Sequence, residues 1–275
     1  MGIFDKRISY KPFEYPEVLQ FVDAINKSFW VHSEIDFTAD VQDFHSNLQP
    51  YEQNAVKHAL LAIAQIEVSV KTFWGNLYNH MPKPELNGLG ATFAECEFRH
   101  SEAYSRLLEV LGYNDEFNNV IEIPAIRERI DYLNTVLANA KSTNHKEYVS
   151  SLLLFSILIE NVSLFSQFAT ILSFTRFKGY MKNVSNIIAW TSVDEQIHAN
   201  AGIYLINKIR EEQPELLTDA DIEDIYGLVD RSVELEAKIL DWIFEAGEID
   251  MFSKEDLLNF MKYRVDDSLK KIGMK

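Results

Sequence analysis

The chain contains few residues that interrupt helices or cross-link a fold. Its 275 residues include only 10 glycines, 7 prolines and one cysteine, Cys96. No proline occurs between Pro124 and Pro214, and so long a stretch without this helix breaker favours long helices in one domain that covers residues 1–275. A single cysteine excludes an internal disulfide bond and is typical of a reducing compartment, so we expect a cytoplasmic protein in which Cys96 is a small buried residue.

Positive charge is also scarce, because 26 Lys and Arg residues face 42 Asp and Glu residues and leave a formal net charge of -16. Such a surface repels nucleic acid and anionic membranes, and we expect neither as a partner. The first residues, MGIFDKRISY, lack the apolar core of a signal peptide. The most apolar run, LLLFSILI at 152–159, is eight residues long, whereas a membrane span needs about 20, so we interpret it as part of a core helix.

Helical periodicity dominates what the chain does contain. We expect helices at about 14–28, 50–79, 86 or 91 to 111, 122–140, 145–173 and 181–210. Two capping boxes, Thr218-x-x-Asp221 and Ser253-x-x-Asp256, predict the start of two further helices. No alternating strand pattern is visible in the sequence, so the predicted fold class is all-α.

One arrangement of acidic and histidine residues occurs twice. In each copy a glutamate is followed about 30 residues later by Glu-x-x-His, and the spacing of three places both members of the pair on one helix face. The first copy is Glu67, Glu97 and His100, and the second is Glu160, Glu195 and His198. A single Glu-x-x-His is also common on solvated helix surfaces, so the pair alone does not indicate a site.

The apolar surroundings of these residues favour burial. Both pairs have apolar neighbours, among them Phe98 and Trp190, and both lone glutamates lie within apolar stretches. A buried ionised carboxylate is costly unless it is paired or bound to a cation. Four carboxylates and two imidazoles from four helices are the ligand set of a dinuclear metal site in a ferritin-like bundle. The pattern therefore predicts such a bundle with two transition-metal ions, and mixed oxygen and imidazole ligation suits iron or manganese.

With these residues in place, the chain resembles the small (β, or R2) subunit of class I ribonucleotide reductase over essentially its whole length. The six residues match that family's metal-ligand positions. Tyr104, seven residues after Glu97, matches the family's radical tyrosine, although an inward tyrosine is usually an ordinary core residue. Trp30 matches the tryptophan near the start of the family's electron-transfer route, and Asp194 matches the acidic link to it. The resemblance thus implies a hydrogen-bonded path from His100 through Asp194 to Trp30.

Two departures from the family pattern refine this interpretation. The first ligand is Glu67, where many members have aspartate, and Lys71 stands four residues later, where an uncharged residue is usual. The combination is similar to the subclass whose dimanganese cofactor is activated by superoxide, and in which the metal pair, not a tyrosyl radical, stores the oxidant. We therefore favour manganese over iron and expect Lys71 near the metals, well placed to attract a small anion. The alternative is an ordinary surface pair of Glu67 and Lys71.

The resemblance also implies partners and a reaction. A homodimer of this subunit would pass an oxidising equivalent to a separate large (α) subunit, which reduces ribonucleotides to deoxyribonucleotides. The sequence has no glycine loop of the kind that cradles phosphate, so we expect no nucleotide site in this chain. It ends at VDDSLKKIGMK, without the flexible docking tail that the family normally carries, so either the sequence is trimmed or docking differs. As written, we expect the chain to assemble its cofactor yet to fail in turnover.

Three other interpretations remain open. A stand-alone ferritin-like oxidase would bind a small apolar ligand beside the metals and act without a partner. An iron-storage or metal-sequestering protein would form a cage, although 275 residues exceed the usual length of a ferritin subunit. A purely structural helical bundle would carry its Glu–His pairs on the surface and bind no transition metal.

Overall fold

The computed structural model describes residues 2–274, apart from the side chains of Ser69, Lys71, Asp219 and Ile222. Within the described residues the chain forms helices and no strand, which confirms the all-α prediction. The α-helices are α1 (Val18–Lys27), α2 (Thr38–Ser46), α3 (Pro50–Gly75), α4 (Leu77–His80), α5 (Pro84–Leu111), α6 (Asn114–Asn118), α7 (Pro124–Leu137), α8 (His145–Leu154), α9 (Phe165–Ser173), α10 (Lys182–Glu212), α11 (Asp219–Ile243) and α12 (Lys254–Lys271). The 3-10 segments are η1 (His32–Glu34), η2 (Val120–Glu122) and η5 (Pro214–Leu216), and the π-helical segments are η3 (Phe155–Ser163) and η4 (Phe174–Lys178).

Local sequence signals account for many of the helix starts. Pro50, Pro84 and Pro124 occupy the first turn of α3, α5 and α7, where a backbone N–H has no partner within the helix and its loss costs nothing. The predicted capping boxes at Thr218 and Ser253 are both present and open α11 and α12. The long helices therefore begin close to the positions that the sequence predicts.

Helix α2 was not predicted from the sequence, because TADVQDFHS is mostly polar and shows no helical repeat of apolar residues. A contact with a distant helix holds it in place instead. The buried Asp40 accepts hydrogen bonds from the backbone N–H groups of Asn183 and Val184, at 2.9 and 3.1 Å, in the first turn of α10. This carboxylate satisfies free N–H groups at the start of α10, which is a tertiary effect that local spacing does not reveal.

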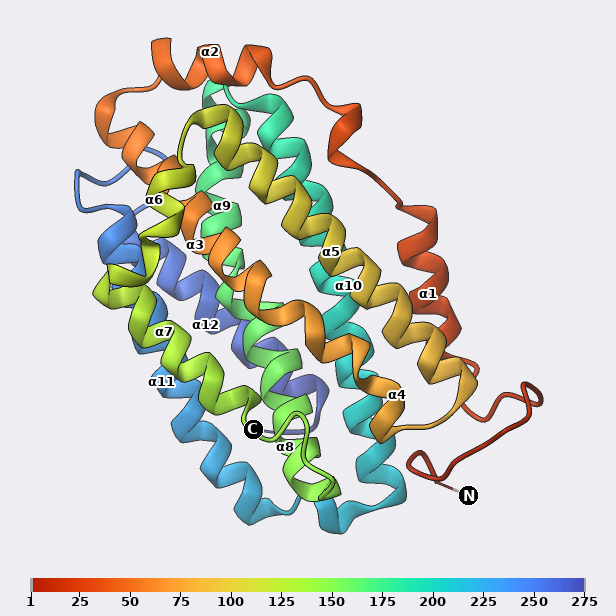
Figure 1. The fold of residues 1–275 in the computed structure, drawn as a ribbon. Helices are drawn as coiled ribbons and strands as arrows, with labels where there is room; N and C mark the ends of the chain where they lie inside the picture. Colours follow the sequence, from red (N-terminus) through yellow and green to blue (C-terminus); the bar gives the residue numbers. More distant parts are fainter. Residues whose placement is uncertain (1, 275) are drawn as a thin grey trace.

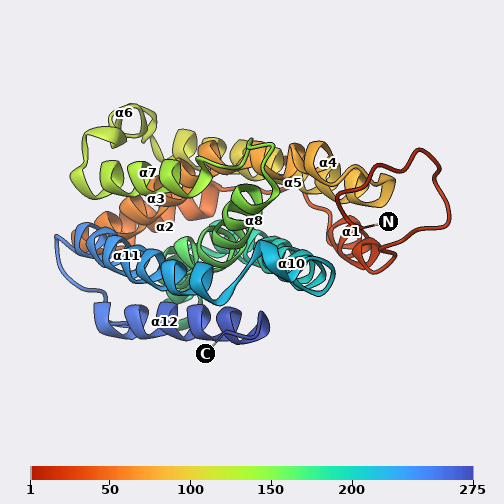
Figure 2. The ribbon, with the colours of Figure 1, turned by 90° about the horizontal axis from the view of Figure 1, so that it is seen from below.

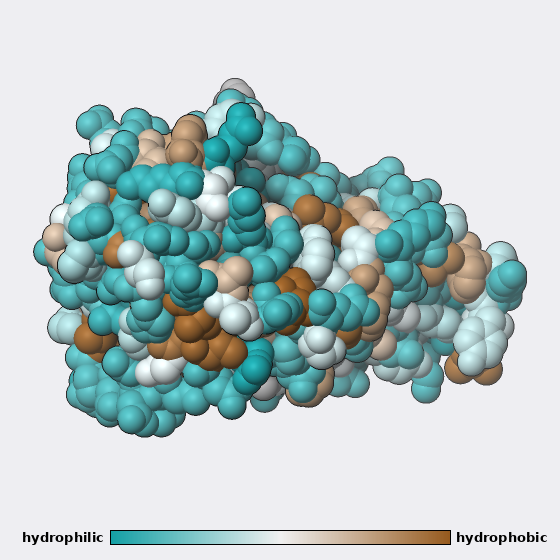
Figure 3. Space-filling model, turned by 90° about the horizontal axis from the view of Figure 1, so that it is seen from above, coloured by the Kyte–Doolittle hydropathy of each residue, from teal (hydrophilic) through white to brown (hydrophobic). Residues whose placement is uncertain are grey.

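The long helices pack side by side around a continuous apolar core. Figure 1 shows α3 and α5 running alongside each other, with α1 next to α5 and α10. In the view from below, α12 is the outermost helix and lies beneath α11 (Figure 2). The face seen from above is mainly hydrophilic, with apolar residues in small separate patches (Figure 3).

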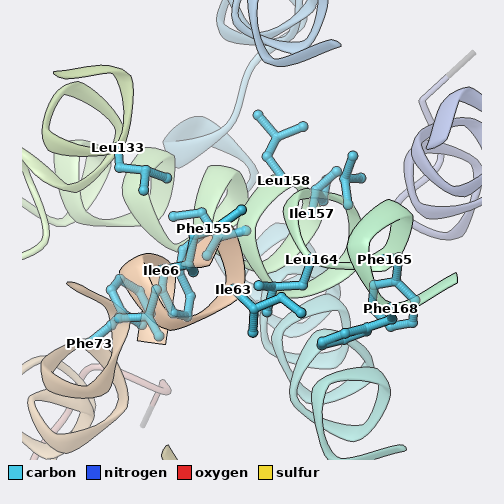
Figure 4. Packing of buried hydrophobic residues seen from close by; sticks show 14 of the residues in the cluster. Ile63, Ile66, Phe73, Leu133, Phe155, Ile157, Leu158, Leu164, Phe165 and Phe168 are labelled. Carbon is cyan, nitrogen blue, oxygen red and sulfur yellow. The ribbon is translucent and has the colours of Figure 1, made fainter. Parts of the chain in front are cut away.

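The helical stretch His145–Lys178 is strongly apolar. A window of 18 residues within it has a mean hydropathy of 1.7, which makes it long and apolar enough to cross a membrane, yet 94% of that window is buried inside the protein. The apolar stretch is therefore longer than the eight residues at 152–159, and its burial confirms the predicted core helix. In Figure 4, Phe155 and Leu158 of this stretch lie in one apolar cluster with Ile63 and Ile66 of α3.

The same stretch widens into a π-helix at η3, which packs on α10. The two segments come very close, because a Cβ atom built on Gly202 would lie 2.0 Å from the Oγ atom of Ser156. Only glycine fits at this point of α10. Ser156 is four residues from Glu160, and Gly202 is four residues from His198. The close approach of Ser156 and Gly202 therefore fixes the distance between η3 and α10 near Glu160 and His198.

Candidate metal centre

Four helical segments bring the six predicted donor residues together in the core. Glu67 comes from α3, Glu97 and His100 from α5, Glu160 from η3, and Glu195 and His198 from α10. None of the six residues is more than 1% exposed. The face of each segment that carries donors is therefore turned inward, away from solvent.

The six donors form two overlapping groups. One donor atom from each of Glu67, Glu97, His100 and Glu195 lies within 4.8 Å of the others, and the same holds for Glu97, Glu160, Glu195 and His198. The Nδ1 atom of His100 lies 3.0 Å from Glu195 Oε1, and the Nδ1 atom of His198 lies 3.0 Å from Glu97 Oε1. Because Glu97 and Glu195 belong to both groups, each is placed to bridge two ions.

Most of the donor atoms lack hydrogen-bond partners. Both carboxylate oxygens of Glu67, Glu97 and Glu195 are buried without a hydrogen bond, and so is Nδ1 of both histidines. Burial raises the pKa of Glu67 and of Glu160 well above the usual range. Burial acts to lower the pKa of His100, yet the acidic groups around it raise that pKa above its ordinary value. Two divalent cations would offset this clustered negative charge, and the donor set suits iron or manganese.

The Nε2 atom of His100, on the side of the ring away from the other donors, is linked to Trp30 by hydrogen bonds through Asp194. The Nε2 atom of His100 lies 3.1 Å from Oδ2 of Asp194, and the indole N–H of Trp30 donates to the same oxygen at 2.9 Å. The Trp30 ring also stacks on the His100 ring, with centroids 5.7 Å apart. The structure thus contains the connection that the resemblance implies, and a carboxylate at Nε2 leaves Nδ1 directed at the other donors.

Two further residues near the donors, Tyr104 and Cys96, are buried. The hydroxyl of Tyr104 donates to Oγ1 of Thr191 at 3.1 Å, and burial together with the charge of Glu67 raises the pKa of Tyr104. The sulfur of Cys96 lies 3.5 Å from Nε2 of His100. Cys96 is therefore the buried residue that was expected, and Tyr104 bonds its hydroxyl to helix α10.

Sequence reasoning missed one residue at this centre and misjudged two others. Trp74 is fully buried, and its indole N–H donates to Oε1 of Glu160 at 2.6 Å. It lies seven residues after Glu67 on α3, so the helical repeat was a signal that could have found it. Phe98 and Trp190, taken as apolar neighbours that favour burial, are instead 53% and 36% exposed. These two residues are close to the donors in sequence, but their side chains are not on the buried helix face that carries the donors.

The side chain of Lys71 lies outside the described residues. Its backbone belongs to α3, four residues after Glu67, and a spacing of four places both residues on one helix face. The position of the ammonium group near the donors stays a prediction.

The sequence is similar to a known protein family over nearly its whole length. The profile of the family described as "Ribonucleotide reductase, small chain" matches residues 7–275. A probable ribonucleoside-diphosphate reductase small subunit, 376L, from Invertebrate iridescent virus 6 is 29% identical over 265 residues, which cover 89% of this chain and 72% of that protein. The ribonucleoside-diphosphate reductase subunit beta of Chlamydia pneumoniae is 25% identical over 260 residues, which cover 90% of this chain and 74% of that protein.

Solved structures share the fold at low sequence identity. The ribonucleotide reductase R2 subunit from Clostridium botulinum matches with a TM-score of 0.90 at 18% identity, over 100% of this chain and 88% of that chain. The Streptococcus sanguinis dimanganese(II)-NrdF matches with a TM-score of 0.84 at 17% identity, over 99% of this chain and 93% of that chain. An R2-like ligand-binding oxidase with a reconstituted Mn/Fe cofactor matches with a TM-score of 0.77 at 17% identity, over 96% of this chain and 98% of that chain. These likenesses confirm the predicted ferritin-like bundle.

Proposed function

The chain belongs to the ribonucleotide reductase small-chain family, and from this membership we propose that it is the small (β) subunit of a class I ribonucleoside-diphosphate reductase. The observation that carries the proposal is the buried set of six donors, in which His100 is connected to Trp30 through Asp194. A purely structural bundle gains nothing from six buried ionisable groups, most of whose polar atoms form no hydrogen bond. The same set suits a pair of transition-metal ions in each chain.

When bound, the metal pair supplies the oxidising equivalent that starts the reaction in the large subunit. Glu97 and Glu195 would bridge the ions, with Glu67 and His100 at one end and Glu160 and His198 at the other. Asp194 orients the His100 ring and accepts the N–H of Trp30. When Trp30 loses an electron, its N–H becomes acidic and passes its proton to Asp194 Oδ2 across 2.9 Å. Positive charge therefore does not accumulate on the buried ring.

Manganese activated by superoxide is the cofactor that we propose in preference to iron. Glu67 and Lys71 support this choice through their resemblance to the dimanganese subclass, with Lys71 drawing a small anion toward the metals. The hydroxyl of Tyr104 supports it as well, because it donates to Thr191 and not to a carboxylate. Oxidation of a tyrosine releases its phenolic proton, and a hydroxyl is a poor acceptor for that proton. The metal pair, and not Tyr104, would then store the oxidant.

The family also implies a homodimer that works with a large (α) subunit on ribonucleoside diphosphates. We place this assembly in the cytoplasm, because a single buried cysteine is compatible with a reducing compartment. The net charge of -16 argues against nucleic acid as a further partner.

An EPR experiment tests the proposal. Metal-free protein is loaded with Mn(II) or Fe(II), each sample is exposed to O2 or to superoxide, and spectra are recorded. We expect a coupled multiline manganese signal that requires superoxide. A sharp tyrosyl signal after iron and O2, lost in Tyr104→Phe, would overturn the choice of manganese. Near-zero bound metal after expression in metal-replete medium would overturn the proposed function itself.

A second function, a stand-alone oxidase acting on a small apolar ligand, is favoured by one observation. The fold matches the R2-like ligand-binding oxidase with a TM-score of 0.77, although it matches two reductase subunits with 0.84 and 0.90. This oxidase would act on a small molecule without a partner and would be unaffected by Trp30→Phe. Metal storage would instead produce a cage of many chains, which native mass spectrometry distinguishes from a dimer.

A further inference from the structure

Helix α12 is connected to the metal centre through one arginine. This helix, the outermost in Figure 2, packs on the π-helical segment η3 that carries Glu160. Nε of Arg264 donates to the backbone oxygen of Asn161 at 2.6 Å, and Nη2 donates to the side-chain oxygen of the same residue at 2.5 Å. The amide of Asn161 donates back to the carbonyl oxygen of Arg264 at 3.1 Å. Hydrogen bonds in both directions therefore tie α12 to η3.

The same guanidinium also contacts helix α10. Nη2 of Arg264 donates to Oε1 of Gln196 at 3.0 Å. Asn161 directly follows Glu160 in the sequence, and Gln196 directly follows Glu195. Both glutamates belong to one of the two donor groups. Arg264 thus holds the two residues that come after two metal-binding glutamates on different segments.

The backbone that carries Glu160 needs such support because it is π-helical. The hydrogen bonds of a π-helix close over a wider turn than those of an α-helix, and such turns are rare. The carboxylate of Glu160 is held on one side, where Oε1 accepts the N–H of Trp74 at 2.6 Å. At the end of η3, the guanidinium of Arg264 lies over the ring of Phe165, with Cζ 3.3 Å from the centroid. Trp74 therefore holds the side chain of Glu160, and Arg264 holds the backbone beside it.

We propose that Arg264 is a positioning residue that fixes Glu160 and thereby sets the affinity of the metal position formed by Glu160 and His198. The inference rests on the proposed function, because it presupposes that the donors bind metal. Arg264 acts through Asn161 and Gln196, whose backbones continue from the donors. A ligand that is already held in place loses less freedom when the ion binds, so the ion binds more tightly.

Charge and position predict opposite results when Arg264 is removed. A positive side chain repels a divalent cation, so loss of its charge alone would strengthen metal binding. Loss of its hydrogen bonds releases the backbone beside Glu160 and should weaken metal binding. The direction of the change in affinity therefore shows which effect dominates.

Manganese titration of the metal-free full chain, followed by the EPR signal of unbound Mn(II), tests this role. Arg264→Leu should weaken one of the two metal positions by about 10–100-fold. Asn161→Ala should weaken the same position by a smaller factor, and the double variant should lose no more than Arg264→Leu alone, since the contact is shared. Arg264→Lys keeps the charge but cannot donate to both oxygens of Asn161 as a planar fork, so it should show most of the loss.

Lys262→Leu is the matched control, because it removes one positive charge from an exposed position of the same helix. This variant should bind both ions as the wild type does. An effect of Arg264→Leu that Lys262→Leu reproduced would be due to charge and would overturn the proposal.

Two background variants assign the affected position. In Glu67→Ala the tighter remaining position is that of Glu160 and His198, and Arg264→Leu should weaken it. In Glu160→Ala the tighter remaining position is that of Glu67 and His100, and Arg264→Leu should leave it unchanged. General destabilisation of the fold would instead weaken the remaining ion in both backgrounds.

Hydrogen exchange gives a second measurement that does not depend on affinity. Coupling between two parts of a protein is reciprocal, so metal held by Glu160 should also stabilise α12. Exchange of the α12 amides should slow when Mn(II) is added to the wild type. In Arg264→Leu the added metal should leave this exchange unchanged.

The proposal is overturned if Arg264→Leu binds Mn(II) as tightly as the wild type or more tightly, or if it weakens both positions equally. Asn161→Ala, which leaves the guanidinium in place, decides the question if Arg264→Leu does not fold, as judged by circular dichroism. Failure of the proposed function has a different result, because the wild type would then bind no manganese at all.

Discussion

Two clusters of charged side chains are buried in the core, and they differ in charge balance. One is the metal centre, where four carboxylates face two imidazoles. The other joins Arg129 of α7 to Glu236 of α11, with Nη1 and Oε1 3.8 Å apart. Both residues of this second pair are at most 1% exposed. Arg129 also donates to Gln65 at 3.2 Å, and Glu236 accepts from Gln167 at 3.2 Å. The protein thus supplies both signs of charge at one cluster and a large excess of one sign at the other.

The difference shows which buried charges depend on something outside the chain. The Arg129–Glu236 pair has its counter-charge within the chain, although Nε and Nη1 of Arg129 form no hydrogen bond, so its contribution to folding should be the same whether or not metal is bound. Among the described side chains, the four carboxylates of the metal centre have only two imidazoles to match them, and most of their oxygens accept no hydrogen bond. Their burial is favourable only when metal is present, and the two clusters should respond to mutation in opposite ways.

The largest expected effect is on metal binding. Glu97 belongs to both donor groups, so Glu97→Ala should reduce affinity for both ions by more than the roughly 10–100-fold typical of changes in the supporting residues around a metal site. Metal content after dialysis and titration calorimetry measure this loss. Glu102→Ala, on the exposed face of the same helix, is the control. Two tightly bound ions in Glu97→Ala would contradict the bridging position.

Glu97→Gln sharpens the comparison between the clusters. It keeps the side-chain volume but removes one buried charge that accepts no hydrogen bond. The metal-free variant should therefore unfold at a higher urea concentration than the metal-free wild type, while it binds metal less tightly. A lower midpoint would mean that Glu97 is satisfied without metal.

Arg129→Leu should act in the opposite direction and cost about 3–5 kcal/mol of unfolding free energy, because it leaves Glu236 buried and unpaired. Urea unfolding should give the same loss with and without bound metal. Arg129→Leu with Glu236→Leu should recover most of it, since both charges are then absent. A loss seen only in the metal-free protein would show that the two clusters are not independent.

The metal centre was more predictable than the Arg129–Glu236 pair, for a reason of spacing. Helical periodicity places Glu97 and His100 on one face, so a local pattern suffices to propose a shared site. The sequence also predicts the long helices, because proline at the first turn and capping boxes are local signals. Nothing local connects Arg129 with Glu236, which lie on different helices far apart in sequence.

The features that sequence reasoning missed depend on tertiary contacts. The π-helix around Glu160 lies where Gly202 lets α10 approach Ser156, and no residue type signals that contact in advance. Helix α2 is held by Asp40 at the start of α10. Trp190 counted among the apolar neighbours that favour burial of the second pair, yet its own position around the helix leaves it 36% exposed.

Asp194→Asn should have a smaller effect than the changes at Glu97 and Arg129. Asp194 is the partner of His100 Nε2, and the loss of its charge should weaken metal affinity by about 10–100-fold while leaving the fold intact. Titration calorimetry measures the affinity, and Ser192→Ala on the same helix is the control. Wild-type affinity in Asp194→Asn would show that the carboxylate does not support His100.

The smallest expected effect is on the pH dependence of the unfolding free energy. It shows whether burial or the charge of Arg129 dominates the pKa of Glu236. Burial raises the pKa of Glu236, and Arg129 only partly opposes this. A carboxyl group whose pKa is higher in the folded state contributes stability that is present below its unfolded pKa, about 4.3, and lost as the pH rises through the folded pKa. Glu236→Gln cannot ionise, so the free energy of unfolding of the wild type should fall relative to that of Glu236→Gln as the pH is raised from 4 to 8. Urea unfolding across this range measures the difference, and a relative gain by the wild type would mean that the charge of Arg129 outweighs burial.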